Sequence, residues 1–500
     1  TEVYFEAIAE ALRIPGSQAL VLLPEIALTS QWLDRFEARF EARPVEWHSD
    51  LTMAQRRRAW RSVAEGEARL VVGARSALFL PFQTLSLIVV DEEHDASFKQ
   101  EDGVFYNARD MAIVRASLEE VSIVLASATP SFETILNVKV GKYTRLELPE
   151  RHGGAAMPEI IAVDMRVEGP PPGRWVSEKL EDALRDALDN GEQGLLFLNR
   201  RGYAPLTICR ACGERLECPN CTACLVEHRY RQELHCHHCG YQIPIPESCP
   251  ACGVEGKLVP SGPGVERLEE EIKTLFPEAR LLIMTSDTVA SPEAARIFVG
   301  KVERHEVDII IGTQIVTKGH HFPQLTCVGV IDADLGLRGG DLRASERTFQ
   351  QLEQVGGRAG REAKPGRVFL QTYMPEHPVA EALLSADRTK FVRRELRARE
   401  RYGMPPFGRL AAVIVSGPDQ ARVLTVCRQL SGSIPTTSGV EVLGPVPAPL
   451  ARLKGQFRFR FLVKTGKGFR IQAFMRRWLA RAGKFKGARV KVDIDPQSFL

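Results

Sequence analysis

The stretch "LIVVDEEHDASF" (87–98) places four ionisable side chains, Asp91 to His94, directly after an all-apolar segment. The continuous run from Leu87 to Val90 is typical of a strand that a parallel sheet buries on both faces. Ligands of such sheets bind just beyond the carboxyl ends of the strands. An acidic pair at this position therefore predicts a site for a metal ion and a phosphate, with an acidic surface turn as the alternative.

Short apolar strands and helical stretches alternate along most of the chain. The first group of expected strands lies at 19–24, 68–73, 85–90 and 122–130. A loop rich in Pro and Gly, "VEGPPPGRW" (167–175), then predicts a domain boundary. The second group of expected strands lies at 194–199, 279–284, 307–312, 327–332 and 367–372. This alternation predicts an α/β fold with two parallel-sheet lobes, and the chain from "MPPFGRLAAVIVSG" (404–417) onward indicates a small α+β unit.

Composition limits the class of protein. Five hundred residues with 44% hydrophobic and 26% charged side chains can form several packed cores, so the length predicts three or four domains. No apolar run approaches the roughly 18 residues that a membrane span needs, and no leader segment opens the chain, so we expect a cytoplasmic protein without membrane contact. The helical pattern that starts at Thr1 has no cap before it, which predicts a chain that begins within a domain.

The end of the chain carries a strong positive charge. Residues 451–500 contain 14 Lys and Arg against 2 Asp and Glu, although the whole chain has a net charge of only +3. Within them, "GQFRFRFLVK" (455–464) alternates aromatic residues with Arg458 and Arg460. A period of two on a strand buries the rings and displays the arginines on the other face. This pattern predicts binding to DNA phosphates, with a solvated basic face as the alternative.

Nine of the eleven cysteines fall between Cys209 and Cys252, which in a reducing compartment favours metal binding over disulfides. Eight of them form CxxC pairs, each able to supply half of a tetrahedral thiolate zinc site. The pairs are Cys209/Cys212, Cys218/Cys221, Cys236/Cys239 and Cys249/Cys252. We therefore expect two closed structural sites, with Cys224 and the nearby histidines as bystanders. Spacing does not fix which pairs share an ion, although joining outer with outer and inner with inner is topologically simple.

The acidic pair after the strand indicates nucleotide hydrolysis. In nucleotide hydrolases the Asp side of such a pair binds Mg²⁺ and the Glu polarises the attacking water. This predicts catalytic roles for Asp91 and Glu92. The small hydroxyls of "SATPS" (127–131) end the next strand, which places them at the same edge of the expected sheet.

A second candidate element for the nucleotide site is "EQVGGRAGR" (353–361). Its spacing predicts that Gln354, Arg358 and Arg361 share one face of a helix. Two arginines aimed at one point suit the charge that develops on a transferring phosphoryl group. The alternative is a solvated surface helix.

Three further strand-end segments offer Thr, Ser, Gly and backbone N–H groups, which typically bind phosphates without reading sequence. They are "LLPEIALTSQW" (22–32), "GARSALFLPF" (73–82) and "GTQIVTKGHHFP" (312–323). We expect a nucleic-acid track shared by both lobes, with Thr29, Thr313 and Lys318 among its contacts. In "DASFKQEDGVFYNARD" (95–110), aromatic residues could stack on unpaired bases, or the loop could tuck them into the lobe interface.

Taken together, these motifs resemble the ordered motif set of superfamily-two helicases. The resemblance rests on "LLPEIALT", "GARSALF", "DEEH", "SATPS", "LNRRGYAP", "GTQIVTKGHHFP" and "QVGGRAGR". The cysteine insert between "LNRRGYAP" and "GPGVERLEEE", followed by "DADLGLRGGDLRASERTFQQLEQVGGRAGR" and "YGMPPFGRLAAV", resembles the bacterial replication-restart helicases of the PriA (primosomal protein N′) family. The similarity extends over essentially the whole chain. It implies an ATP-dependent DNA helicase with two RecA-like lobes, a zinc-binding insert in the second lobe and a C-terminal DNA-binding domain.

The resemblance implies a role for each matching residue. It assigns Mg²⁺-ATP hydrolysis to Asp91, Glu92, Arg358 and Arg361. It assigns nucleotide contact and coupling of hydrolysis to DNA to Thr1, His94, Ser127, Thr129 and Gln354. It implies nested zinc pairing, with Cys209, Cys212, Cys249 and Cys252 for one ion and Cys218, Cys221, Cys236 and Cys239 for the other. The expected domains are 1–150 (first lobe), 151–208 and 253–386 (second lobe), 209–252 (cysteine insert) and 387–500 (basic C-terminal domain).

The family also implies a biological setting. Its members translocate 3′ to 5′, recognise stalled forks and D-loops, displace single-strand-binding protein and help other primosomal proteins to load the replicative helicase. We expect the same partners here, namely forked and single-stranded DNA, single-strand-binding protein and primosomal proteins, bound by a monomer associated with the nucleoid.

The sequence departs from the family pattern at its start. Family members carry an N-terminal DNA-binding region, a winged helix and a phosphate loop, GxxxxGKT, before the acidic box. Thr1 matches the last residue of that loop, so the lysine and glycines that hold the β- and γ-phosphates are absent from the sequence. We therefore expect an N-terminally truncated chain with an incomplete ATP site that hydrolyses ATP poorly on its own.

Two other functions fit parts of the sequence. A zinc-bearing adaptor for DNA and proteins would need only the insert and the basic end of the chain. A related motor, such as a fork-reversal or restriction translocase, would need the two lobes but is not expected to carry two zinc ions inside the second one. Zinc content and DNA-stimulated ATP hydrolysis distinguish these alternatives from a replication-restart helicase.

Overall fold

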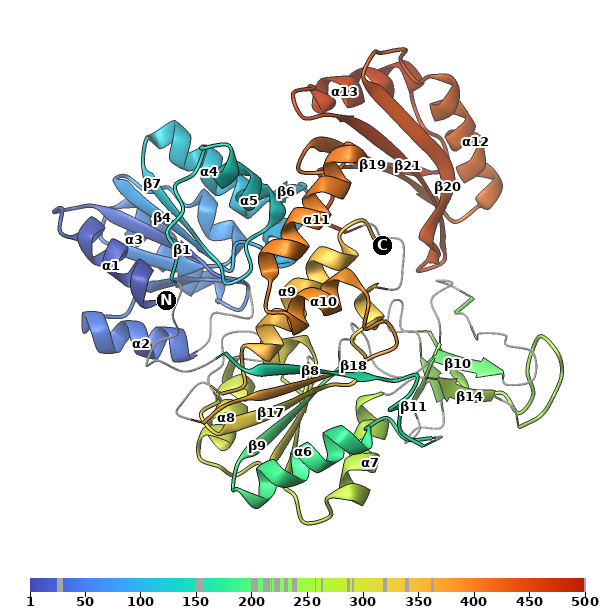
Figure 1. Cartoon of the computed structure of the whole chain (residues 1–500). Coiled ribbons are helices and arrows are strands. Elements are labelled where there is room, and N and C mark those ends of the chain that lie inside the picture. Colours follow the sequence, from blue (N-terminus) through green and yellow to red (C-terminus); the bar gives the residue numbers. More distant parts are fainter. Residues whose placement is uncertain are drawn as a thin grey trace.

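A computed structural model gives the structure of most of the chain (Figure 1). The residues that it describes are 1–24, 30–148, 157–171, 173–198, 206–209, 216, 218–219, 225–228, 233–235, 241–256, 258–261, 264–285, 288–289, 292–317, 322–337, 341–360 and 364–498. None of the helices in this part of the chain is long and apolar enough to cross a membrane.

The first lobe is a five-stranded parallel sheet with helices on both faces, and its strand order is β2-β3-β1-β4-β7 (Figure 1). Its strands are β1 (Gln18–Leu22), β2 (Val45–Trp47), β3 (Leu70–Gly73), β4 (Leu85–Asp91) and β7 (Ser122–Ala126). Its helices are α1 (Glu2–Leu12), α2 (Ser30–Phe40), α3 (Met53–Ala64), α4 (Ala108–Glu119) and α5 (Phe132–Lys139). The four predicted strands are confirmed, whereas the three-residue β2 is too short to stand out as an apolar run.

Strand β4 lies inside this sheet, between β1 and β7. Ile88 and Val90 pack into the core on one face of the sheet, and Leu87 and Val89 pack into the core on the other face. A strand with two buried faces needs apolar residues at every position, which explains its continuous apolar run. The strand ends at Asp91 and so delivers the acidic box to the carboxyl edge of the sheet.

The second lobe is a six-stranded parallel sheet of order β15-β16-β9-β17-β18-β8. Its strands are β8 (Glu159–Asp164), β9 (Gln193–Phe197), β15 (Leu281–Met284), β16 (Ile309–Gly312), β17 (Leu325–Val330) and β18 (Arg367–Thr372). Its helices are α6 (Glu178–Asp189), α7 (Val265–Leu275), α8 (Pro292–Glu303) and α9 (Ala344–Gly356). The five predicted strands are confirmed, and the predicted fold of two parallel-sheet α/β lobes is correct.

One predicted boundary is wrong. Strand β8 pairs in parallel with β18 at the edge of the second sheet, so the second lobe begins before the Pro- and Gly-rich loop at 167–175. That loop connects β8 to α6 within the lobe. Pro and Gly mark any turn, and only the pairing partner, some 200 residues later in the chain, tells which sheet a strand joins.

The cysteine-rich insert forms a separate antiparallel sheet between β9 and α7, with strand order β13-β12-β11-β10-β14. Its strands are β10 (Leu206–Cys209), β11 (Val226–His228), β12 (Glu233–His235), β13 (Gln242–Pro244) and β14 (Leu258–Ser261). Leu216, Leu225 and Leu234 form a small core with Cys218, and Leu450 of the C-terminal domain packs against it. The insert therefore contacts the C-terminal domain.

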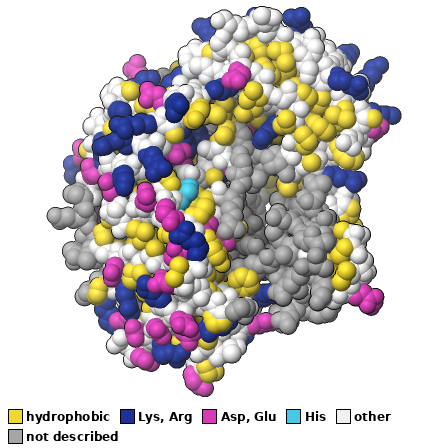
Figure 2. Space-filling view, turned by 45° about the vertical axis from the view of Figure 1, so that its right-hand side comes forward, with side chains coloured by type: hydrophobic (Ala, Val, Ile, Leu, Met, Phe, Trp, Pro, Cys, Tyr) yellow, Lys and Arg dark blue, Asp and Glu magenta, His cyan; other side chains and the backbone are white. Residues whose placement is uncertain are grey.

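The C-terminal domain is a four-stranded antiparallel sheet, β20-β21-β19-β22, with two helices packed on one face. Its elements are β19 (Gly408–Gly417), α12 (Gln420–Gly432), β20 (Val440–Leu453), β21 (Gln456–Gly466), α13 (Ile471–Ala482) and β22 (Arg489–Ile494). The fully buried Trp478 of α13 meets Phe461 of β21 edge to face, with ring centroids 5.6 Å apart. Figure 2 shows Lys and Arg side chains at the margin of this domain. The predicted α+β unit is confirmed.

Two helices lead from the second lobe to the C-terminal domain, α10 (Pro378–Leu384) and α11 (Arg388–Arg401). Phe391 of α11 stacks on Phe349 of α9 with a centroid distance of 4.5 Å and lies 6.1 Å from Phe132 of the first lobe. Helix α11 therefore occupies the junction between the lobes (Figure 1). The remaining short elements are η1 (Arg75–Phe79), η2 (Ala96–Phe98), β5 (Lys99–Gln100), β6 (Tyr106–Asn107), η5 (Gln314–Thr317) and η6 (Leu335–Leu337).

Candidate functional site

The acidic box forms a tight turn at the end of β4. Asp91 Oδ1 accepts a hydrogen bond from the Glu92 backbone N–H at 3.0 Å, and the Glu93 N–H donates to the Ala126 carbonyl of β7 at 3.1 Å. Glu92 has a φ of +48°, in the left-handed region that side chains other than glycine rarely adopt. Such local strain is concentrated at functional sites. The turn thus holds the box in a conformation that its residue types do not favour by themselves.

Asp91 is held from the first helix. Tyr4 donates its hydroxyl proton to Asp91 Oδ2 at 2.8 Å and accepts a hydrogen bond from Trp32 Nε1 at 2.7 Å. Burial and the Asp91 charge raise the pKa of Tyr4 well above its usual value, so the hydroxyl stays protonated and can donate. Because Tyr4 lies one turn from Thr1, the start of α1 is on the Asp91 side of the lobe. Tyr4 was not among the site residues predicted from the sequence. Its place one turn after Thr1, the predicted end of the phosphate loop, was the signal that could have found it.

Glu92 and His94 meet a side chain from the other lobe. Gln354 Nε2, on α9, lies 3.3 Å from Glu92 Oε2 and 3.1 Å from His94 Nε2. A carboxylate only accepts hydrogen bonds, so the amide nitrogen of Gln354 must face it, and His94 Nε2 must then accept as well. The proton of a neutral His94 is therefore on Nδ1, which lies 2.8 Å from Ser127 Oγ. The predicted residues Glu92, His94, Ser127 and Gln354 thus form one hydrogen-bonded chain across the lobe interface.

Thr129 and Gln350 extend this chain. The buried Thr129 places its Oγ1 3.3 Å from His94 Nε2, and its backbone N–H donates to Ser127 Oγ at 2.9 Å. Gln350 Nε2, one turn before Gln354 on α9, donates to the Thr129 carbonyl at 3.1 Å. Ser127 and Thr129 therefore lie together at this interface, and Gln350 contacts Thr129. Gln350 was not predicted from the sequence, although its spacing of four residues from Gln354 was a signal that could have found it.

Glu93, like Asp91, is held by side chains of the first lobe. It is 2% exposed, its carboxylate accepts from the Ser131 N–H at 2.7 Å, and it pairs with Arg109 at 3.1 Å. Arg109 also donates to Ser131 Oγ at 2.8 Å. A buried carboxylate with these partners is already satisfied, which points to a structural task. Glu93 ties the box to Ser131, the residue that caps α5.

A charged cluster continues from this point to the second lobe. Arg343 pairs with Glu133 of α5, and its Nη1 lies 3.2 Å from Glu346 of α9. Burial by itself would raise the pKa of Glu133, but the Arg343 guanidinium holds it well below its usual range. Glu133 is therefore charged at neutral pH, and these buried ion pairs join the two lobes.

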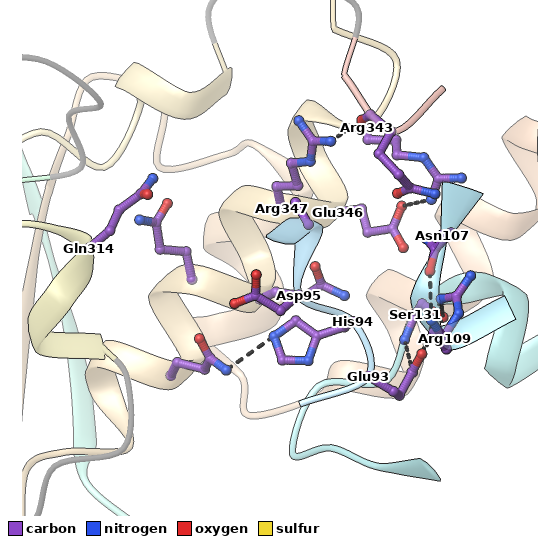
Figure 3. Close-up of a pocket in the computed structure, with 15 residues that line it drawn as sticks. Glu93, His94, Asp95, Asn107, Arg109, Ser131, Gln314, Arg343, Glu346 and Arg347 are labelled. Carbon is purple, nitrogen blue, oxygen red and sulfur yellow. Dashed lines mark hydrogen bonds and ion pairs between the residues drawn. The ribbon is translucent and has the colours of Figure 1, made fainter. Parts of the chain in front are cut away.

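A pocket of about 100 Å³ lies between these elements (Figure 3). In Figure 3, His94 and Asp95 from the first lobe face Arg347 and Gln314 from the second. The backbone of Gln497, near the end of the chain, closes one side by accepting a hydrogen bond from Arg347. Almost all of the residues that line the pocket are polar or charged, so it can hold water and charged groups.

The predicted arginine pair lies only partly within the described residues. Helix α9 ends at Gly356, so Gln354 is helical but Arg358 follows the helix in a turn, and the predicted shared helical face is wrong. The two glycines 356 and 357 end the helix because glycine is the least helix-favouring residue after proline. Arg358 is 6% exposed. Arg361 lies outside the described residues.

The predicted DNA contacts are scattered. Thr313 is half-buried at the end of β16, whereas Thr29 and Lys318 lie outside the described residues. On β21, rings and arginines alternate as predicted, but Arg458 and Arg460 are half-buried rather than displayed. Burial lowers the pKa of both guanidinium groups, and Asp341 of the second lobe partly offsets this at Arg460. The arginine face of β21 thus turns toward the second lobe.

The aromatic loop at 95–110 packs against the rest of the protein. Phe98 is 1% exposed in the core of the first lobe, and Tyr106 meets Phe79 edge to face at 5.1 Å. Lys491 of the C-terminal domain places its Nζ 4.3 Å from the Phe105 ring centroid. The aromatics of this loop therefore pack within the first lobe and against the C-terminal domain, not in the interface between the two lobes.

Three of the cysteines predicted to share one zinc ion lie together. The sulfurs of Cys209, Cys249 and Cys252 are all within 4.8 Å of one another, and Cys209 and Cys252 are 3.8 Å apart. The knuckle turn is closed by the Gly253 N–H, which donates to the Cys249 carbonyl at 2.8 Å, and Gly253 has the positive φ that this turn needs. Three thiols at this spacing fit the donor set of tetrahedral zinc. Four more predicted ligands, Cys212, Cys221, Cys236 and Cys239, lie outside the described residues.

Comparisons with known proteins identify the family. The family models described as "DEAD/DEAH box helicase", "PriA DNA helicase Cys-rich region (CRR) domain" and "Primosomal protein N C-terminal domain" match residues 1–138, 218–244 and 400–497. The replication restart protein PriA of Rickettsia conorii is 47% identical over 499 residues, which cover 100% of this chain and 77% of that protein. This chain belongs to the PriA family of replication restart proteins.

Other PriA proteins match over the same range. PriA of Haemophilus influenzae is 38% identical, with 99% of this chain and 68% of that protein covered, and PriA of Bacillus subtilis is 38% identical, with 100% and 63% covered. Among solved structures, RecG bound to a three-way DNA junction aligns with 80% of this chain and 42% of its own at 16% identity and a TM-score of 0.44. Membership of the PriA family makes this protein a DNA helicase of replication restart with a zinc-binding Cys-rich region.

Proposed function

We propose that this PriA-family helicase hydrolyses Mg²⁺-ATP at the edge of the first lobe and couples hydrolysis to DNA through the lobe interface. The hydrogen-bonded chain from Glu92 through Gln354 and His94 to Ser127 carries the proposal. Asp91 offers the hard carboxylate oxygen that Mg²⁺ prefers, and the metal would polarise the phosphates there. Glu92 would orient and polarise the attacking water.

The remaining nucleotide contacts in this proposal come from three places. Thr1 starts the helix whose Tyr4 holds Asp91. Thr129 joins the first lobe to Gln350 of the second. Arg358 and Arg361 would contact the γ-phosphate from the second lobe, where their charge stabilises the transition state.

Glu92→Gln tests the assignment of the box. The change keeps the size and the bond to Gln354 but removes the negative charge, so we expect DNA-stimulated ATP hydrolysis to fall by roughly 10²- to 10⁴-fold. DNA binding should be unchanged because Glu92 is not among the proposed DNA contacts. The measurement is the ATP turnover rate on forked DNA, in protein with a complete phosphate loop. Glu67→Gln, an exposed change in the same lobe, is the control, and full activity of Glu92→Gln would refute the role.

We also propose that the protein acts at stalled forks and D-loops, moves 3′ to 5′ on single-stranded DNA and initiates primosome assembly. Family membership supports this setting. The partners in this proposal are forked and single-stranded DNA, single-strand-binding protein and other primosomal proteins, contacted by a monomer at the nucleoid. Strand displacement on substrates with only a 3′ or only a 5′ single-stranded arm measures the direction, and activity confined to the 5′ arm would contradict it.

Two structural zinc ions are proposed for the Cys-rich region. One would be held by Cys209, Cys212, Cys249 and Cys252, and the other by Cys218, Cys221, Cys236 and Cys239. The grouping of Cys209 with Cys249 and Cys252 supports the nested pairing, because it joins the first and last CxxC pairs. Four thiolates leave no open coordination position, so these ions would stabilise the insert rather than take part in hydrolysis.

Zinc content tests this arrangement. We expect about two zinc ions per chain by elemental analysis, because eight thiolates complete two tetrahedral sites. Cys249→Ser should lower the content to about one, whereas Cys224→Ser, which alters the ninth cysteine of the insert, should leave it at about two. A content of zero or one in the parent protein, or loss of zinc in Cys224→Ser, would contradict the double site.

The domain organisation and DNA track are proposals as well. We propose lobes at 1–150 and at 151–208 with 253–386, a zinc insert at 209–252 and a basic DNA-binding domain at 387–500. The sheet of the insert extends beyond the proposed bounds, because it includes β10 and β14. Thr29, Thr313 and Lys318 would contact the DNA backbone across the lobes. Arg458 and Arg460 would bind phosphates from the C-terminal domain, whose high local positive charge supports this role.

Salt dependence tests the last assignment. Each side-chain charge that neutralises a phosphate adds about one unit to the slope of log K against log salt, so replacing Arg458 and Arg460 by Gln should reduce the slope by about two. The measurement is DNA affinity at several salt concentrations, with Arg428→Gln on the exposed face of α12 as the control. An unchanged slope would leave these arginines a purely structural role in packing the domain.

A further inference from the structure

The buried guanidinium of Arg399, on α11, lies where three parts of the chain meet. Its Nη1 donates to Glu346 Oε2 of α9 at 3.0 Å and to the Pro405 carbonyl oxygen at 3.4 Å. Its guanidinium carbon lies 4.5 Å from the ring centroid of Phe132 in the first lobe. One side chain, 6% exposed, therefore contacts the first lobe, the second lobe and the segment that leads to the C-terminal domain.

The partner of Arg399, Glu346, also binds the start of α5. The first N–H groups of a helix have no acceptor within the helix. Phe132, the first residue of α5, donates its N–H to Glu346 Oε1 at 3.1 Å. Arg399 and Arg343 both donate to the other oxygen of the same carboxylate, so Arg399 helps to fix the acceptor at the start of α5. Helix α5 directly follows the segment 127–131, which contains the partners of His94.

The other end of α11 contacts the same segment. Arg388, the first residue of the helix, donates to the Ala128 carbonyl oxygen, and its guanidinium is 4.0 Å from Glu353 of α9. Both ends of α11 are therefore bound to residues 128–132 of the first lobe. Because α11 is one continuous helix of 14 residues, a displacement of the helix would move both of its contacts with residues 128–132 together.

The C-terminal domain is connected to this helix and to both lobes. Met404, in the link from α11 to β19, donates its N–H to the Arg399 carbonyl at 2.8 Å. Farther along, Asp493 of β22 pairs with Lys99 of the first lobe at 2.7 Å, and the Gln497 carbonyl accepts from Arg347 of the second. A shift of this domain against the lobes must therefore strain or break its contacts with Lys99 and Arg347, and it acts on α11 through the link at Met404.

We propose that Arg399 is a positioning residue, which transmits the state of the DNA-bound C-terminal domain to the segment 127–131 and so to the acidic box. The inference rests on the proposed function, because it needs DNA at the C-terminal domain and a coupling role for Ser127 and Thr129. The buried Glu346 carboxylate pairs with Arg343 of its own lobe as well as with Arg399 of α11. The contact with Arg399 can therefore break and form again without leaving a buried carboxylate unpaired.

Hydrogen exchange tests this proposal directly. The Phe132 amide reports on the lobe contact, because its acceptor is a side chain of the other lobe. In the parent protein, forked DNA should change the exchange rate of the peptide that spans 127–136. Arg399→Gln should bind DNA but lose this response, and it should hydrolyse more ATP per base pair unwound. Arg397→Gln, an exposed change on the same helix, should keep the parent response.

The outcomes separate the proposal from the function on which it rests. If the parent protein does not bind forked DNA, the proposed function fails. If Arg399→Gln binds DNA and keeps the parent response at 127–136, the positioning role is wrong. Should Arg399→Gln unfold, Arg399→Met removes the charge that pairs with Glu346 but keeps an apolar side chain against Phe132, and a full response in that variant would equally overturn the proposal.

Discussion

Three polar side chains of one helix, each a turn after the last, carry the contact between the two lobes. On α9, Glu346 accepts a hydrogen bond from the Phe132 N–H, and Gln350 donates one to the Thr129 carbonyl. Gln354 donates to Glu92 and His94. Their spacing of four residues puts them on one face of the helix. Buried polar groups must be paired, and leaving one unpaired costs about 1–3 kcal/mol. The distance between the lobes is therefore set by this row of side chains.

Alternate residues of the acidic box, 91–94, contact different lobes. Asp91 and Glu93 are held within the first lobe, by Tyr4 and by Arg109 with Ser131. Glu92 and His94, the residues between and after them, turn toward Gln354. The positive φ of Glu92 makes this division possible, because it reverses the chain at that residue. One half of the box is thus fixed, and the other half responds to the position of α9.

Prediction from sequence succeeded where the signal was local. The apolar run of β4 and the alternation along β21 each depend on neighbouring residues, and each predicted a strand that the structure contains. It failed where the deciding partner is distant in the chain. Strand β8 joins its sheet through β18, about 200 residues later, and the burial of Arg460 depends on the second lobe. Tyr4 was not predicted, because its partner Asp91 lies 87 residues later in the chain.

The most direct test is a double-mutant cycle between His94 and Gln354, with DNA-stimulated ATP turnover as the measurement. If the two residues act as one unit across the interface, His94→Ala and Gln354→Ala together should cost little more than the more damaging single change. The coupling energy should then lie at about 0.5–3 kcal/mol, the range for residues in contact. Single effects that simply multiply in the double variant would contradict a site that works through the lobe interface.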